Sequence, residues 1–128
     1  MIALLTGIFS SCVEDDLANP QSDRDKFIGA WDVNENCQRI SYSVTIEADP
    51  TNSAQVILKN FWLIGYQEEP PYAIVAGNNI VIPKQYIANN KDIEVTGSGN
   101  YSDEEITWNF TVNDGADLYT CDAFYEKP

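Results

Sequence analysis

The sequence predicts an all-β domain, an antiparallel up-and-down barrel of about eight strands, with a β-sandwich as the alternative. Apolar and polar residues alternate with a period of two in several segments, as they do in half-buried strands. Turn-forming residues separate these segments at short intervals, and short connections between successive strands favour antiparallel pairing. No helical pattern interrupts the series, so the strands either close into a barrel or divide into two packed sheets.

The first half of the domain contains three predicted strands. The first lies within residues 27–37, the second spans 41–47, and a turn rich in Asp, Pro and Asn follows at 49–53. The third is a denser apolar run at 55–63, whose two faces the pattern alone does not assign. The inward positions of the first strand are Phe27, Gly29, Trp31, Val33 and Cys37.

The second half continues with short strands at similar spacing. Strands at 72–76 and 80–82 flank the tight hairpin turn Gly77-Asn78-Asn79, and Pro83 is expected to end the second strand or mark it as an edge. Two glycines on the inward face of the next strand indicate sharp bending or a close backbone approach; they are Gly97 and Gly99. The last three predicted strands occupy 93–101, 106–112 and 119–125.

Charge and composition exclude several functions. The chain of 128 residues suits one domain, and its 20 acidic and 7 basic residues give a net charge of −13. Such a surface repels phosphates and anionic lipid headgroups, so we expect no nucleic-acid partner. Histidine is absent, which removes the commonest general base and the usual zinc ligand. We therefore expect a protein that is not an enzyme and that uses no metal or cofactor; a hydrolase using paired carboxylates is disfavoured because consecutive acidic residues on a turn point apart.

The N-terminal segment is uncharged and mostly apolar over residues 1–11 and is followed by Cys12. It is too short to span a bilayer, which takes about 20 apolar residues, but it suits the apolar region of a secretory signal. With small residues before the cysteine, it resembles the signal of bacterial lipoproteins, which are cleaved before a cysteine that is then acylated. The acidic residues 13–16 resemble the tract that directs some lipoproteins to the cell surface. The resemblance implies lipidation of Cys12 and an extracytoplasmic location in the outer membrane; an ordinary buried cysteine is the alternative.

The predicted organisation has three parts. Residues 1–11 form the lipoprotein signal peptide, 12–26 the acylated cysteine with an acidic flexible tether, and 27–128 a single β-barrel domain. A helical turn over residues 23–26, packed beside Phe27, is an alternative for the end of the tether. Membrane contact is expected through the lipid anchor only.

Cys37 and Cys121 remain as a pair if Cys12 is acylated, in a compartment where disulfides persist. In a closed meander with an even number of strands, the first and last strands are adjacent and antiparallel. Cys37 ends the first strand, Cys121 lies near the start of the last, and both share the apolar face of their strand. We expect a disulfide that stabilises the barrel by about 4 kcal/mol through the entropy of the unfolded chain; two free buried cysteines are the alternative.

The head of the first strand, Gly29-Ala30-Trp31, is similar to the Gly-x-Trp of lipocalins, in which the tryptophan plugs one end of an eight-stranded barrel. Together with the acylation signal, the acidic tether and the cysteine in the last strand, it resembles small bacterial lipoproteins with a lipocalin-like domain. The resemblance covers about residues 27–126 in general pattern. It implies that Trp31 is a structural plug and that the domain binds a small molecule.

The candidate ligand-binding residues are aromatic: Trp62, Trp108 and Tyr119. Aromatic rings bind apolar molecules, but they also fill cores, and Trp31 and Trp108 lie on the apolar faces of their strands. An eight-stranded barrel can be filled by side chains or hold one small ligand, and the many aromatic residues favour a nearly filled interior. We expect non-enzymatic binding of a small apolar ligand. The alternative is a structural or interaction module that contacts another envelope protein.

Overall fold

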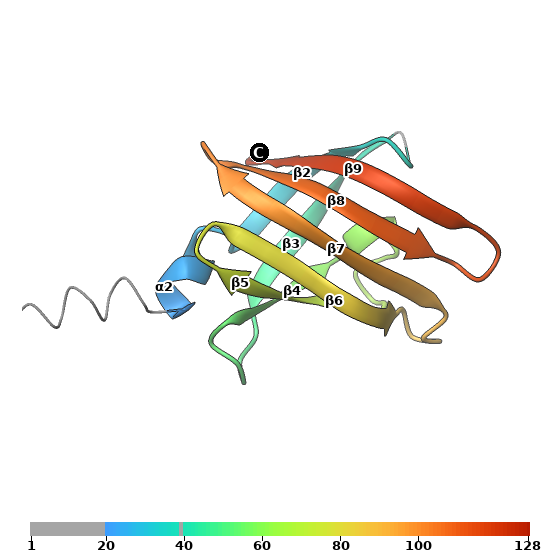
Figure 1. Ribbon diagram of the computed structural model, residues 1–128, viewed down its shortest axis with the longest axis horizontal. Helices are drawn as coiled ribbons and strands as arrows, with labels where there is room; N and C mark the ends of the chain where they lie inside the picture. The colour runs from blue at the N-terminus through green and yellow to red at the C-terminus, as the bar shows by residue number, and fades with distance from the viewer. Residues whose placement is uncertain (1–19, 39) are drawn as a thin grey trace, which may run out of the picture.

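The computed structural model describes residues 20–38 and 40–128, and within them eight antiparallel strands close into one barrel (Figure 1). Each strand pairs with the next along the chain, and the last pairs with the first. The strands are β2 (Gly29–Glu35), β3 (Ser41–Ala48), β4 (Gln55–Lys59), β5 (Tyr72–Ala76), β6 (Asn79–Ile87), β7 (Ile93–Ser102), β8 (Glu105–Asn113) and β9 (Leu118–Glu126). The predicted up-and-down barrel is therefore confirmed, and the closed strand order excludes the sandwich.

The described residues also form two short helices at opposite ends of the barrel. Helix α2 (Pro20–Asp25) precedes β2, and the 3₁₀ helix η1 (Phe61–Leu63) follows β4. Figure 1 shows α2 against one end of the strands, which we call the α2 end; the other is the η1 end. Helix α2 occupies the last part of the segment predicted as a tether, where the sequence also allows a helical turn. In the described part of the chain, no helix has the length and apolar character needed to cross a membrane.

The interior is one continuous hydrophobic core to which every strand contributes. Its largest fully buried side chains are aromatic: Trp31, Trp108, Tyr125, Phe27 and Phe61. The inward glycines of β7 make room for this packing. A Cβ added at Gly97 would lie 2.4 Å from the Cβ of Phe110, and one at Gly99 would lie 2.9 Å from the ring of Trp108. The predicted close approach at these glycines is thus present.

Strand β6 differs from the prediction at Pro83. The strand does not end there but continues to Ile87, and its pairing with β7 shifts between Ile82 and Gln85. Two residues of β6 face one residue of β7 at this point, which is a β-bulge, a position where a sheet tolerates proline. The extra residue changes the parity of the strand, so Ile82 and Ile87 are both buried although five positions separate them.

The α2 end is closed by hydrogen bonds from one arginine. Arg24 is buried, and its Nη1 donates to the carbonyl oxygens of Asp49, Asn52 and Gln55, at 3.2, 2.8 and 3.0 Å. The first two carbonyls belong to the turn between β3 and β4, and the third belongs to the first residue of β4. Beside them Trp31 donates its indole N–H to the carbonyl of Phe27 at 2.8 Å. The helix is therefore fastened to the barrel by a charged group that satisfies buried backbone oxygens.

Candidate functional site

The η1 end is built around a strained turn. Asn60, Trp62 and Leu63 have φ values of 67°, 56° and 60°, in the left-handed region that bulky residues rarely adopt. Strain of this kind persists only where the surroundings enforce it, and it is concentrated at functional sites. The sequence gives a plain apolar run here, so the strand expected over 55–63 is wrong beyond Lys59, where β4 ends.

The side chain of Asn60 holds this turn in place. Its Nδ2 donates to the carbonyl of Ser43 at 2.8 Å, and its Oδ1 accepts from the backbone N–H of Gly65 at 2.8 Å. Asparagine tolerates the left-handed conformation better than other residues with a Cβ. The consequence is that Phe61 enters the core, with its ring centroid 4.9 Å from that of Phe110, whereas Trp62 lies partly exposed at the barrel end.

Trp62 lines a depression of about 320 Å³ that is open to solvent. Gln38 also lines the depression and is hydrogen-bonded to Trp62: its Nε2 donates to the Trp62 carbonyl at 3.1 Å. The indole nitrogen of Trp62 is buried and has no hydrogen-bond acceptor among the described residues. The lining combines apolar and polar side chains: Trp62, Leu63, Ile64, Ala88 and Ile93 with Gln38, Glu68, Asn90 and Asp92.

The structure brings together two of the three predicted ligand-binding residues. The ring of Tyr119 lies 5.4 Å from that of Trp62, centroid to centroid, so both belong to the η1 end. Trp108 lies elsewhere, fully buried in the core with its ring 5.5 Å from that of Tyr125. Trp31 is also fully buried, at the α2 end. Both tryptophans thus occupy the core positions that their place on the apolar faces of their strands favours.

A carboxyl group that the sequence analysis did not single out lies under the η1 end. Glu35 is only 7% exposed, and its Oε1 accepts a hydrogen bond from the hydroxyl of Tyr42. Its Oε2 is buried and has no partner among the described residues. The signal was present in the sequence, because Glu35 falls on the inward positions of the first strand between Val33 and Cys37.

The surroundings of Glu35 alter its ionisation and that of two tyrosines. Burial raises the pKa of Glu35 above its ordinary value of 4.5, and hydrogen bonding from the Tyr42 hydroxyl and from the backbone of Gln38 opposes this only in part. Burial also raises the pKa of Tyr42 and of Tyr125, and the negative charge of Glu35 adds to both shifts. Both phenols therefore stay neutral at physiological pH, and Glu35 is the group of the three that titrates.

The predicted disulfide is confirmed. Cys37 and Cys121 are bonded, with their Cα atoms 5.6 Å apart and a sequence separation of 84. Asn36 prepares this contact, because its backbone N–H donates to the carbonyl of Asp122 at 3.1 Å and its Oδ1 accepts from the N–H of Asp122 at 2.9 Å. These bonds extend the pairing of β2 with β9 by one residue and place the two cysteines opposite each other.

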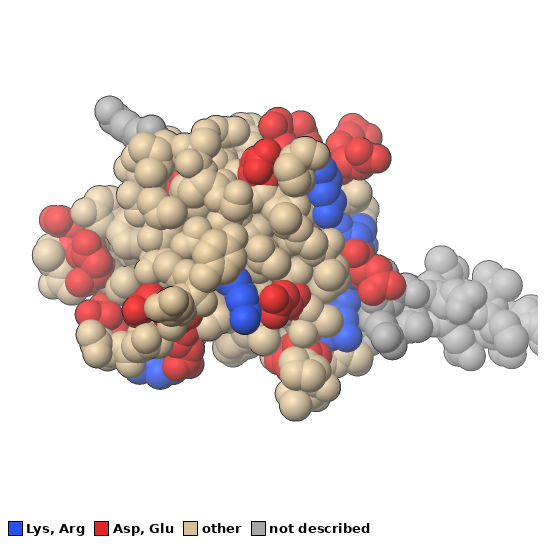
Figure 2. Space-filling view, turned by 180° about the vertical axis from the view of Figure 1, so that it is seen from behind, with Lys and Arg blue, Asp and Glu red and all other residues tan. Residues whose placement is uncertain are grey.

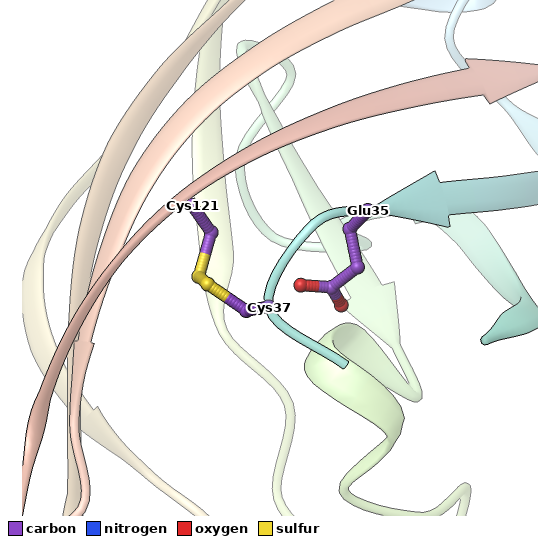
Figure 3. A group of neighbouring side chains, drawn as sticks. All are labelled: Glu35, Cys37 and Cys121. Atoms are coloured by element: carbon purple, nitrogen blue, oxygen red, sulfur yellow. A yellow bond between two sulfur atoms is a disulfide. The ribbon is translucent and has the colours of Figure 1, made fainter. Parts of the chain in front are cut away.

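Glu35 and the disulfide form one cluster, in which a carboxylate oxygen and the two sulfur atoms lie within 4.8 Å of one another. Figure 3 shows the carboxyl group turned from the end of β2 toward the bridge. Thiolates bind metals, but both sulfur atoms here are bonded to each other, so the oxidised cluster is not a metal site. The predicted lipidation site, Cys12, lies outside the described residues.

Acidic residues dominate the charged surface without forming one patch. Figure 2 shows acidic groups at several places around one face, fewer basic groups, and a broad uncharged area between them. Three ion pairs occur in the described part of the chain, and all join exposed or half-exposed side chains.

The geometry defines a class, an antiparallel up-and-down β-barrel of eight strands with a strained, aromatic-lined depression at one end. No family model, no curated protein and no solved structure matches this chain. Its function is therefore argued from the site itself.

Proposed function

We propose that this chain is a lipid-anchored, extracytoplasmic binding domain that takes a small apolar molecule in the depression at the η1 end. The observation that carries the proposal is the position of Trp62. A strained backbone exposes part of a large aromatic ring that would otherwise be expected in the core. The ring lies beside Tyr119 and above apolar side chains, in a hollow of about 320 Å³, which suits a ligand of one or two rings.

The proposed site differs from an internal cavity. Fully buried side chains from every strand fill the barrel, so the ligand is expected at the end of the barrel and not along its axis. Ligand pockets combine apolar walls with a few polar groups that orient the ligand. Here the side-chain amides of Gln38 and Asn90 supply such groups. A ligand with one hydrogen-bond acceptor is favoured over a pure hydrocarbon.

The lipid anchor and the outer-membrane location rest on residues 1–16. An apolar segment followed by small residues, Cys12 and an acidic tract supports cleavage and acylation, as in the lipoproteins that this segment resembles. Palmitate labelling of the whole cell tests this part separately. Label is expected in the wild-type chain and not in Cys12→Ser, and equal labelling of both would overturn the anchor.

The likeness to lipocalins has support at the α2 end. Trp31, which carries the likeness, is fully buried and packs edge-on against Tyr101, with ring centroids 6.5 Å apart. The ammonium group of Lys127 lies 4.1 Å from the Trp31 ring centroid, within the range of a cation–π contact. These contacts suit a tryptophan that plugs one end of a barrel. We therefore propose a lipocalin-like architecture whose binding site is at the opposite end.

Titration with a neutral fluorescent probe, N-phenyl-1-naphthylamine, tests the binding site. We expect saturable fluorescence enhancement with the wild-type chain and a loss of at least about tenfold in affinity for Trp62→Ala, since burial of a large aromatic contact is removed. Phe124→Ala is the matched control, because Phe124 is an aromatic residue 51% exposed on β9, away from the depression. Equal losses in both variants, or no loss in either, would contradict the proposal.

A structural or interaction module is the second candidate, and one observation favours it. Several apolar side chains are exposed on the outer face of β5 and β6, where isolated folded domains usually place polar residues. The two strands pair so that Ile74 lies opposite Val81. If the probe does not bind the wild-type chain at all, this candidate replaces the first. The exposed residues are Tyr72, Ile74, Val81 and Tyr86.

A further inference from the structure

We propose that the Cys37–Cys121 bridge takes part in thiol–disulfide exchange and that Glu35 transfers the proton to the buried sulfur. The partner is a small dithiol or the dithiol of a reductase. The inference rests on the cluster at the end of β2 and is independent of ligand binding in the depression. Three features carry it: unequal access to the two sulfur atoms, an unpartnered buried carboxyl oxygen beside them, and neutral groups on the other sides.

The two cysteines differ in exposure. Cys37 is half-buried in the turn after β2, whereas Cys121 is fully buried in β9. A thiolate from outside can therefore reach the sulfur of Cys37 more readily than that of Cys121. Attack on Cys37 makes Cys121 the leaving group. The sulfur that must carry the new negative charge is thus the one that lies out of water.

A buried thiolate is costly unless it gains a proton or a positive partner. Glu35 is the nearby group that can supply the proton, since a carboxylate oxygen lies within 4.8 Å of both sulfur atoms. One oxygen is fixed by the Tyr42 hydroxyl, and the other has no partner among the described residues. This leaves one oxygen free to hold a proton and deliver it, directly or through one water molecule.

A thiolate of the external dithiol forms a bond to Cys37 Sγ, the S–S bond breaks, and its electron pair goes to Cys121 Sγ. The protonated carboxyl of Glu35 gives its proton to this sulfur and becomes a carboxylate, which later regains a proton from water. The second thiolate of the dithiol attacks its own sulfur in the mixed disulfide and releases Cys37 as a thiol after protonation by water. The protein bridge is reduced and the dithiol is oxidised to a disulfide.

The groups that face Glu35 leave it free to titrate. Tyr42 faces it from β3 and Tyr125 from β9, and burial raises the pKa of both hydroxyls, so neither gains a charge in the working range. Burial raises the pKa of Glu35 itself, so the proton is retained at a higher pH than on an exposed glutamate. The exchange rate per thiolate should therefore fall as the pH rises through the titration of Glu35.

The test measures reduction of the bridge by trifluoroethanethiol from pH 4.5 to 8.5, in the full chain with Cys12→Ser. The rate constant is divided by the fraction of the thiol present as thiolate. We expect this normalised constant to fall about tenfold or more as the pH rises, because general acid catalysis is lost. Glu35→Gln keeps an acceptor for the Tyr42 hydroxyl but cannot supply the proton, and its normalised constant should not vary with pH.

Two further measurements test whether the pH step belongs to Glu35 and whether the external thiol attacks Cys37. Glu126→Gln removes an exposed carboxylate at the other end of β9 and should retain the wild-type pH profile. The mixed disulfide, trapped by acid and located by peptide mass, should carry the external thiol on Cys37. A wild-type profile without a pH step, the same step in Glu35→Gln, or an adduct mainly on Cys121 would each overturn the proposal.

Discussion

The two ends of the barrel close in different ways. At the α2 end a buried arginine donates to three backbone carbonyls, and the indole N–H of Trp31 has its acceptor. At the η1 end the backbone is strained, and both Trp62 Nε1 and Glu35 Oε2 are buried without a partner among the described residues. The α2 end is arranged for stability, although Arg24 Nε is itself unpartnered there. The η1 end, in contrast, carries buried polar atoms whose hydrogen bonds are not formed within the described residues.

On a filled barrel, a binding site is expected at one end and not along the axis. A core in which each strand contributes fully buried side chains stabilises the fold and leaves little room for a ligand. Unpartnered polar groups and strained backbone reduce stability, and they are usually retained for a functional reason. Positive φ values also occur at the α2 end, at Asp103 and Glu104 in the β7–β8 turn, and the indole nitrogen of Trp108 is unpartnered in the core. Only at the η1 end of the described barrel do both features lie beside the depression and the disulfide. Four predictions test that contrast.

The largest expected effect comes from removing the bridge. Replacing both Cys37 and Cys121 by Ser, in a chain that also carries Cys12→Ser, should lower the free energy of unfolding by about 4 kcal/mol, since the bridge closes a loop of 84 positions. Urea unfolding followed by tryptophan fluorescence measures it. A loss below about 1 kcal/mol would mean that the η1 end is held by other contacts.

Loss of the arginine contacts at the α2 end comes next. Arg24→Met keeps much of the side-chain volume but removes the hydrogen bonds to three carbonyls, and should cost about 2–3 kcal/mol. The free energy of unfolding of Arg24→Lys should lie between those of the wild-type chain and Arg24→Met, because a single ammonium group replaces the planar guanidinium. Probe binding at the η1 end should be unchanged in both. A weakened probe affinity would break the proposed separation of the two ends.

The strained turn gives a smaller effect on stability but a direct one on the site. Asn60→Ala should cost about 2 kcal/mol, from two lost hydrogen bonds and an unfavourable positive φ. Asn60→Gly restores the backbone freedom but not the bonds, and should be less destabilised by about 1 kcal/mol. Both should weaken probe binding, because both release the loop that carries Trp62. Thermal unfolding and the probe titration measure the two effects.

The smallest effect is the pH dependence due to Glu35. Its pKa is raised in the folded state, so the folded chain holds a proton that the unfolded chain has released. Its contribution to stability is fully present below about pH 4.5 and is lost as the pH rises through the folded pKa, by at most about 1.4 kcal/mol per pH unit. The difference in unfolding free energy between wild type and Glu35→Gln should change over that window. A constant difference would show that Glu35 titrates as it does in the unfolded chain.

Much of the fold follows from the sequence because strand alternation is a local signal. It predicts eight strands, the pairing of the first with the last, and the partner of Cys37, since parity and position both follow from the pattern. The continuation of β6 beyond Pro83 does not follow, because a bulge depends on how β7 accommodates the extra residue. The backbone of residues 60–63 does not follow either, because an apolar run carries no sign of positive φ.

The candidate site was predictable only in part, for similar reasons. Trp62 and Tyr119 could be selected as aromatic residues, but their contact depends on a turn held by one asparagine. Glu35 was not predicted as a site residue, because the argument from alternation rested on apolar side chains and Glu35 is charged. Its inward position follows from the same alternation that places Val33 and Cys37. Arg24 was not expected as a buried residue because its carbonyl partners lie more than 20 positions away.

The η1 end is the proposed binding end of the barrel. Amide NMR spectra of the ¹⁵N-labelled chain, titrated with N-phenyl-1-naphthylamine, test it most directly. We expect shifts that saturate and that concentrate at Gln38, Trp62, Ile64, Ala88 and Ile93, with the amides of residues 20–31 and 49–55 unchanged. Shifts concentrated at the α2 end or on the outer face of β5 and β6, or none at saturating probe, would contradict it.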